Sequence, residues 1–454
     1  MLSLVIAALV IAWVGYMIVK KYFPQTILII AGAVLLFIAA LIGVKGGLLG
    51  AKVTTGSIWL DIFHTFTTIA KSRVGGLGLM IMSIAGFAQY MEYVGASRAL
   101  FAIVGRPLKK IKSPYILLVF SFFISQFLVL FIPSHAGLGL LLMVTLYPVL
   151  IRSGVSKMSA LGVIGCAQYM DVGPGSGNAI LAANIASLDV ATFFVKHQLP
   201  VFLTTTIVLG FVHYFVQKYW DKKEGFVVGE SNDIPEVDSN EKIPPLSYAI
   251  LPVLPMVLIL GFSPIFKSPI KMDVVTAMLL STLTSMIFEH FRTRNVKLVF
   301  ESIKHFFEGM GKSFTNTISL IIAGEFFAAG LMKIGAVDTL IKGAQDIGLG
   351  AKPMTIAVCL IIAFCAFLMG SGNAAFFSFA ALAPKIAEFL KIPIIDLILP
   401  MQIMTSFGRV VSPITAAIIA IAGVAGVSSV QVVKRTAIPM LVAALINITF
   451  ILLR

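Results

Sequence analysis

The sequence is poor in charged residues. Asp, Glu, Lys and Arg make up 12% of its 454 residues, about half the share that is usual in soluble domains. Hydrophobic residues reach 59%, and the mean hydropathy is +1.01. Short alternating strands, which would mark a membrane β-barrel, are missing as well. These absences exclude an ordinary soluble enzyme and predict a helical protein that lies in a lipid bilayer.

Cysteine and the familiar catalytic motifs are also scarce. Cys166, Cys359 and Cys365 lie in apolar segments at spacings that do not suit a metal site, so we expect packed thiols. The sequence has no phosphate-binding loop, zinc motif or nucleophile constellation. This argues against an ATP-driven pump and predicts no bound cofactor, with an intramembrane enzyme as an alternative.

Acidic residues are fewer than basic ones, which gives a formal net charge of +14. An excess of this size could indicate nucleic-acid binding. The basic residues, however, lie largely in short loops between apolar runs, the pattern that sets the orientation of membrane proteins. We therefore expect the bilayer, and no nucleic acid, as the partner.

The apolar runs are many, each of roughly the length that spans a bilayer. The first begins at Leu2 without a basic leader or a small-residue cleavage site, so we expect a retained span. The only long polar stretch, residues 218–245, is a predicted linker. It divides the chain into the halves 1–217 and 246–454, which we treat as its two structural units.

The two halves carry a predicted internal repeat. A constant offset, which places Gly370 opposite Ser134, aligns Ser134–Ala186 with Gly370–Ala422 without gaps and matches a proline and a serine. Each half would contain one re-entrant hairpin followed by one broken span. The predicted hairpins are about 133–150 and 369–386, and the predicted broken spans are about 160–190 and 397–422.

Polar breaks interrupt these apolar segments at Ser134–Gly137, Gly175–Asn178, Gly370–Asn373 and Val411–Thr415. Glycine, serine and asparagine form helices poorly. An unwound backbone inside a bilayer survives only where it is buried in protein or lines a polar cavity. Four breaks that meet near the midplane would form a binding site, as in carriers with inverted repeats, although small-residue helix packing is the alternative. The predicted substrate- and ion-binding residues are Ser134, His135, Gly137, Gly175, Ser176, Gly177, Asn178, Ser371, Gly372, Asn373, Arg409, Ser412 and Thr415.

Charged residues inside apolar segments are costly and normally have a partner. Arg409 suits bidentate binding of a carboxylate, either on a substrate or in a structural ion pair with Asp171 or Glu325. Asp171 and Glu325 are candidates for coupling to H⁺ or Na⁺, or each simply pairs with a neighbouring base. His135 could carry a proton, donate to substrate or pack at a hairpin tip.

The basic loops also bear on topology. The loop at 98–112 and the basic amphipathic segment 291–312 should be cytoplasmic. The counterpart of that segment, residues 45–75, would then lie at the outer interface, as inverted repeats require. This arrangement needs the proline-containing Tyr248–Phe262 not to cross the membrane.

Five motifs give the sequence a family likeness: Gly137–Met143, Asp221–Glu224, Met369–Ala374, Gly408–Pro413, and Val432–Thr436 followed by Pro439. With these motifs the chain resembles the anaerobic C4-dicarboxylate carriers of the DcuC family over most of its length. The resemblance implies scaffold and transport domains, two re-entrant hairpins, an elevator-type mechanism and a homodimer. It also implies substrates such as succinate and fumarate.

The leading hypothesis is thus an all-α polytopic protein of the bacterial inner membrane with two inverted repeats. It would be a secondary transporter of C4-dicarboxylates that works by ion-coupled symport, efflux or exchange. One alternative is a carrier of the same fold for another small organic anion or an amino acid. The other is a passive anion channel.

Overall fold

A computed structural model of the chain describes residues 2–43, 47–49, 53–227, 244–336, 339 and 350–453. Every regular element in these ranges is a helix, and eight of the described helices are long and apolar enough to cross a membrane. This confirms the all-helical class that the composition predicted. Most of the predicted linker 218–245 lies outside the described residues, and its first residues belong to the end of α12 (Leu199–Lys223).

Two long interrupted helices, which we call the crossing helices, organise one side of the molecule. Each contains a π-turn near its middle, where the backbone hydrogen bonds skip one residue further than in an α-helix. The first crossing helix joins α3 (Ile58–Arg73), η1 (Val74–Gly78) and α4 (Leu79–Tyr93). The second joins α15 (Val296–Ser302), α16 (Lys304–Ser313), η6 (Phe314–Ile318) and α17 (Ser319–Lys333).

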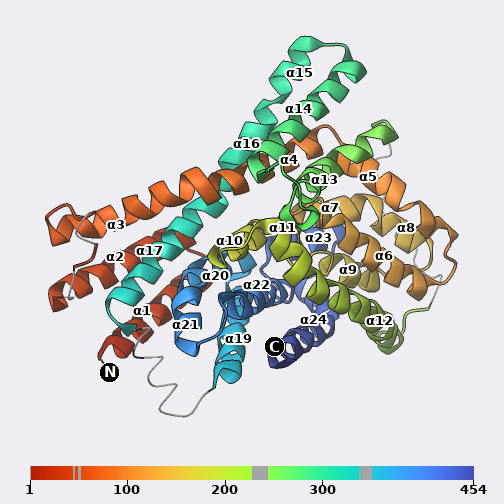
Figure 1. Cartoon of the computed structure of the whole chain (residues 1–454). Helices are drawn as coiled ribbons and strands as arrows, with labels where there is room; N and C mark the ends of the chain where they lie inside the picture. The colour runs from red at the N-terminus through yellow and green to blue at the C-terminus, as the bar shows by residue number, and fades with distance from the viewer. Residues whose placement is uncertain are drawn as a thin grey trace.

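The crossing helices run antiparallel. α3 packs on α17 and α4 packs on α16, so the first part of each meets the second part of the other (Figure 1). Glycines allow the close approach, since a Cβ on Gly309 would lie 2.6 Å from the carbonyl oxygen of Ala85. The described end of the segment 45–75, which was expected at the outer interface, is continuous with the span that follows it in one helix of 36 residues, Ile58–Tyr93. The glycines of η1 are accommodated in a π-turn and do not end the helix.

Shorter and peripheral helices flank the crossing helices. α2 packs on α17, and its counterpart α14 packs on α4. The proline-containing stretch that was expected not to cross the membrane forms two short helices, η4 and α13, which are not among the candidate spans of full length. The bounds are α1 (Leu2–Val19), α2 (Pro24–Ile42), α5 (Ala96–Val104), η2 (Arg106–Lys110), η4 (Leu246–Val253), α13 (Leu254–Gly261), η5 (Pro264–Phe266) and α14 (Val274–Thr293).

Two helical hairpins lie beside the crossing helices. In the first, α6 (Pro114–Leu128) runs to residues 129–134, and the chain returns through α7 (His135–Thr145) and α8 (Tyr147–Arg152), which packs beside α6. In the second, α19 (Ala351–Met369) turns at Gly370 and returns through α20 (Gly372–Phe379), η7 (Ala380–Leu382) and α21 (Ala383–Leu390). The predicted stretches 133–150 and 369–386 therefore correspond to the returning arms, and the preceding apolar helices supply the other arms.

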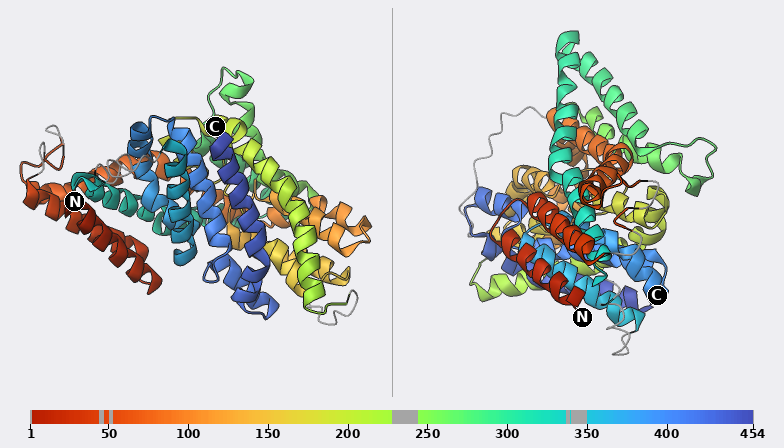
Figure 2. Two further views of the ribbon diagram at one scale, coloured as in Figure 1. Left: turned by 90° about the horizontal axis from the view of Figure 1, so that it is seen from below. Right: turned by 90° about the vertical axis from the view of Figure 1, so that its left-hand side faces the viewer.

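A broken helix follows each hairpin. α9 (Lys157–Gly165) and α10 (Gly177–Ile185) are separated by residues 166–176, and α22 (Ile394–Val410) and α23 (Ala416–Ala425) by residues 411–415. Each broken helix leads into a long final helix, α12 after α11 (Val190–Thr192) and η3 (Phe193–Gln198), and α24 (Ser429–Leu453). α12 and α24 pack against each other (Figure 2). We call the two hairpins and the two broken helices the tip bundle.

The same order of helices recurs in the two halves. α7 begins at His135 and its counterpart α20 at Gly372, while α9 begins at Lys157 and its counterpart α22 at Ile394. The offset in sequence is the same for both pairs. It is one position larger than the offset that was predicted from the sequence. The crossing helices, hairpins and broken helices are thus each present twice, which supports the predicted repeat.

Candidate functional site

Serine residues begin the three helices whose N-termini face the crossing helices. The hydroxyls of Ser134 (α7), Ser176 (α10) and Ser371 (α20) each accept a hydrogen bond from the backbone N–H three residues on, at 3.1, 3.4 and 3.1 Å. Such caps satisfy one of the free N–H groups at a helix start. The others, together with the aligned peptide dipoles, leave a partial positive charge there. Three of the four predicted polar breaks thus supply helix N-termini that are suited to anions.

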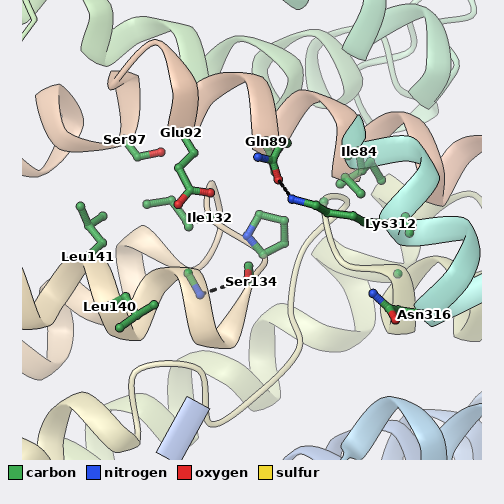
Figure 3. Close-up of a pocket in the computed structure, with 18 of the residues that line it drawn as sticks. Ile84, Gln89, Glu92, Ser97, Ile132, Ser134, Leu140, Leu141, Lys312 and Asn316 are labelled. Atoms are coloured by element: carbon green, nitrogen blue, oxygen red, sulfur yellow. Dashed lines mark hydrogen bonds between the residues drawn. The ribbon is translucent and has the colours of Figure 1, made fainter. Parts of the chain in front are cut away.

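A cavity of about 430 Å³ lies between these N-termini and the crossing helices (Figure 3). Residues at the start of α7, α10 and α20 line one side, and residues of α4, α16 and η6 line the other. The structure places five of the predicted binding residues in its wall: Ser134, Gly137, Gly175, Gly177 and Asn373.

Sequence reasoning missed the polar residues on the crossing-helix side. Gln89, Glu92 and Arg98 come from α4 and α5, and Lys312 and Asn316 lie four residues apart in the second crossing helix. The Lys312 ammonium donates a hydrogen bond to Gln89 Oε1 at 3.3 Å (Figure 3). The one signal for Lys312 was its place at the end of the basic segment 291–312, which had been interpreted only in terms of membrane orientation.

Arg409 pairs with Asp171 behind the cavity wall. Its two terminal nitrogens lie 2.9 Å from the two carboxylate oxygens, and both side chains are more than nine-tenths buried. Bidentate geometry of this kind is the strong form of a carboxylate–guanidinium contact. Of the alternatives for Arg409, the structure shows the ion pair with Asp171.

Further buried groups surround the Asp171 carboxylate. Asn178 Nδ2 donates to it at 2.6 Å, Gln168 Nε2 at 2.8 Å and the Ser406 hydroxyl at 3.2 Å. Gln402 Nε2 donates to the Asp171 carbonyl at 2.6 Å. The network joins the break between α9 and α10 to α22, so it fixes one broken helix to the other.

The remaining predicted residues lie outside the cavity lining. His135 Nε2 is 3.4 Å from the Gly165 carbonyl oxygen, and the Thr415 hydroxyl donates to the Arg409 carbonyl at 2.5 Å. Gly372 packs against the Thr405 carbonyl, and Ser412 is fully buried. Ser176 and Ser371 act as helix caps, and Asn178 and Arg409 belong to the Asp171 network.

Glu325 lies on the crossing helices, away from Asp171. Arg73 Nε is 2.7 and 2.8 Å from its two carboxylate oxygens, and a terminal Arg73 nitrogen donates to Asn184 Oδ1 of α10 at 3.3 Å. Both intramembrane acids therefore have a guanidinium partner. Among the described residues, no group of His, Cys, Asp and Glu could hold a metal ion.

Two solved transporters share this fold. The chain matches MtrF of Neisseria gonorrhoeae, described as illuminating a class of antimetabolite efflux pumps, with a TM-score of 0.66 and 15% identity over 95% of this chain and 94% of that one. It matches the YdaH transporter of Alcanivorax borkumensis, described as having an unusual topology, with a TM-score of 0.63 and 13% identity over 95% and 97%. At these identities the likeness concerns the fold.

Sequence relatives are more specific. The chain is 35% identical over 442 residues to a probable anaerobic C4-dicarboxylate transporter DcuC of Vibrio cholerae, covering 97% of this chain and 95% of the relative. It is 33% identical over 447 residues to the anaerobic C4-dicarboxylate transporter DcuC of Escherichia coli K12, covering 98% and 95%. The family model described as "C4-dicarboxylate anaerobic carrier" matches residues 2–454. Both relatives are named as transporters and not as enzymes, and this chain belongs with them to the DcuC family of C4-dicarboxylate anaerobic carriers.

Proposed function

We propose that this protein is a secondary carrier that moves C4-dicarboxylates such as succinate and fumarate across the inner membrane of a bacterium. One observation carries the proposal: the N-termini of α7, α10 and α20 converge on a single cavity whose opposite wall includes Lys312. Helix N-termini and ammonium groups both bind carboxylates. The names of the Vibrio and Escherichia relatives give the same substrate class.

Substrate would bind at the interface between the tip bundle and the crossing helices. The backbone N–H groups at the starts of α7, α10 and α20 and the side-chain amide of Asn373 are groups of the tip bundle that could donate to a carboxylate. Asp171 and Arg409 neutralise each other behind this wall, so their charges position the broken helices and leave the anion to the helix N-termini.

The carrier works by an elevator movement of the tip bundle past the crossing helices. The Asp171–Arg409 network ties α22 to the α9–α10 break, and a Cβ on Gly370 would lie 2.8 Å from Ile414, so the second hairpin tip also contacts the second break. Contacts of this kind support movement of the bundle as one unit. The antiparallel crossing helices support the proposal that the two halves are inverted repeats, and the carrier would act as a homodimer.

Transport is driven by an ion gradient or by exchange. Asp171 and Glu325 are the proposed coupling groups, because each is an intramembrane carboxylate whose guanidinium partner would have to adjust when a proton or Na⁺ binds.

Uptake of labelled succinate into proteoliposomes tests the proposal. Separate arms impose a proton gradient, a sodium gradient, or a preload of fumarate. We expect saturable uptake that at least one arm stimulates. No uptake in any arm, by protein shown to be folded, would overturn the dicarboxylate assignment, and an unsaturable current that follows the voltage would indicate a channel instead.

A further inference from the structure

Two basic residues occupy comparable places in the two crossing helices. Arg73 is the last residue of α3, directly before the π-turn η1, and Lys312 lies in the last turn of α16, just before the π-turn η6. Each faces the other crossing helix, Arg73 toward Glu325 and Lys312 toward Gln89. Because the helices run antiparallel, the two residues stand on opposite sides of the crossing.

Arg73 and Lys312 differ in the charge of the groups that they contact. The Arg73 guanidinium meets the Glu325 carboxylate at 2.7 Å and also reaches Asn184 of the tip bundle. The Lys312 ammonium meets only the neutral amide of Gln89 among the described residues, at 3.3 Å. An amide satisfies one of its three donors and does not compensate its charge. Lys312 is therefore available to an anion, and it stands in the cavity wall.

The groups around Lys312 also favour an anion. Asn316 lines the cavity one helical turn further on, and Ser134 at the start of α7 lines it from the tip bundle (Figure 3). Asn373 of α20 also lines the cavity from the tip bundle. Glu92 lies one turn beyond Gln89 on α4, in the part of the wall that also holds Arg98. Residues with hydrogen-bond donors therefore line the cavity on both walls, which favours a ligand with an acceptor at each end.

We propose that Lys312 binds one carboxylate of the substrate from the crossing-helix side while the helix N-termini of the tip bundle bind the other. This inference rests on the proposed function and deepens it, because it makes Lys312 the residue that distinguishes dicarboxylates from monocarboxylates. A monocarboxylate can bind to the helix N-termini of the tip bundle, but it provides no second carboxylate for Lys312. The contact of Lys312 with the second carboxylate would thus make the carrier prefer dicarboxylates to monocarboxylates.

The test compares Lys312→Gln and Lys312→Arg with wild type in proteoliposomes, using succinate and its monomethyl ester. Lys304→Gln is the matched control, since it removes the same charge from an exposed position of α16 that does not line the cavity. We expect Lys312→Gln to raise the KM for succinate roughly tenfold, the usual size of a lost charge-assisted contact, with a smaller change in the maximal rate. Lys312→Arg should recover most of the affinity, and Lys304→Gln should behave as wild type.

The ester separates specific binding from general attraction of anions. Wild type should prefer succinate to the monomethyl ester, and Lys312→Gln should lose most of that preference, because substitution and ester remove the same contact. If wild type transports succinate and Lys312→Gln keeps its KM and its preference, the inference is wrong while the proposed function stands. If wild type fails to transport succinate, the proposed function itself is wrong.

Discussion

The buried ion pair of Asp171 with Arg409 and the cavity in front of it use polar groups in opposite ways. Behind the wall, each oxygen of the Asp171 carboxylate has donors within hydrogen-bond distance, and the charges of Asp171 and Arg409 compensate each other inside the protein. At the wall, Lys312, Asn373 and residues at the starts of three helices line an open cavity. The comparison shows that a charge deep in the fold can stabilise the scaffold, while uncharged residues such as glycine and asparagine line the cavity.

The largest effect should come from removing one partner of the buried pair. Arg409→Gln leaves the Asp171 carboxylate buried without a cation, which we expect to cost about 3–5 kcal/mol of stability. The double variant Arg409→Gln with Asp171→Asn should recover much of this loss, because no uncompensated charge remains. Thermal unfolding in detergent measures both. If the single variant were as stable as wild type and had lost only succinate affinity, Arg409 would be a substrate ligand and the comparison would fail.

Two asparagines that the sequence placed in one site sharpen the comparison. Asn178 donates to Asp171 at 2.6 Å in the interior, whereas Asn373 lines the cavity. Asn178→Ala should lower the free energy of unfolding by about 1–3 kcal/mol, since it removes a hydrogen bond to a buried charge. Asn373→Ala should leave stability nearly unchanged and reduce succinate uptake several-fold. Equal effects of the two variants on both readouts would erase the distinction.

The Arg73–Glu325 pair should give a smaller effect. Arg73 is partly exposed and connects the crossing helices to Asn184 of the tip bundle. Glu325→Gln removes its anionic partner, so this side of the interface should open more often. A cysteine in place of Ala183, the fully buried neighbour of Asn184 in α10, should then react faster with a water-soluble thiol reagent. Cys365 is replaced by Ala in this experiment because it is the one native cysteine that is not fully buried. An unchanged rate would show that the pair does not hold this side closed.

The smallest effect is expected at the exposed end of α12. Burial raises the pKa of the Glu224 carboxyl, but hydrogen bonds and charge from Arg435 and Lys434 outweigh this and hold it below its usual value. A lowered pKa contributes stability above the unfolded value of 4.5, and the contribution disappears as the pH falls through the lower folded value. Unfolding temperatures measured from pH 7 to pH 3 should fall less for Glu224→Gln than for wild type. A parallel pair of curves would contradict this assignment.

The breaks in the helices were predictable because their cause is local. Glycine, serine and asparagine disfavour a helix wherever they stand, so the starts of α7, α10 and α20 could be located without tertiary information. Local chemistry did not reveal that η1 is absorbed into a long helix. Of its three glycines, only Gly78 meets the second crossing helix, where a Cβ would lie 3.3 Å from Ile318, while Gly75 and Gly76 face open space. The packing of the flanking α3 and α4 on the second crossing helix therefore outweighs the low helix propensity of this short segment.

The partners of the charged residues were not predictable. The sequence left three possible partners for Arg409: a substrate carboxylate, Asp171 and Glu325. It could not show that Asp171, which is distant in the chain, lies 2.9 Å away in the fold. Lys312 was missed for the same reason, since a lysine at the end of a basic segment is normally solvated. Only the crossing of two distant helices makes it part of a cavity wall.

Protection of the cavity by substrate would test the central claim most directly. A cysteine in place of Ala88, which lines the cavity from α4, can report access to it, with Cys365 replaced by Ala. A cysteine in place of Lys297, an exposed residue outside the cavity lining, serves as the control. The account predicts that succinate slows labelling at position 88 in a saturable way, that its monomethyl ester does so more weakly, and that neither affects position 297. Labelling at position 88 that is unchanged by saturating succinate, in protein that transports succinate, would contradict it.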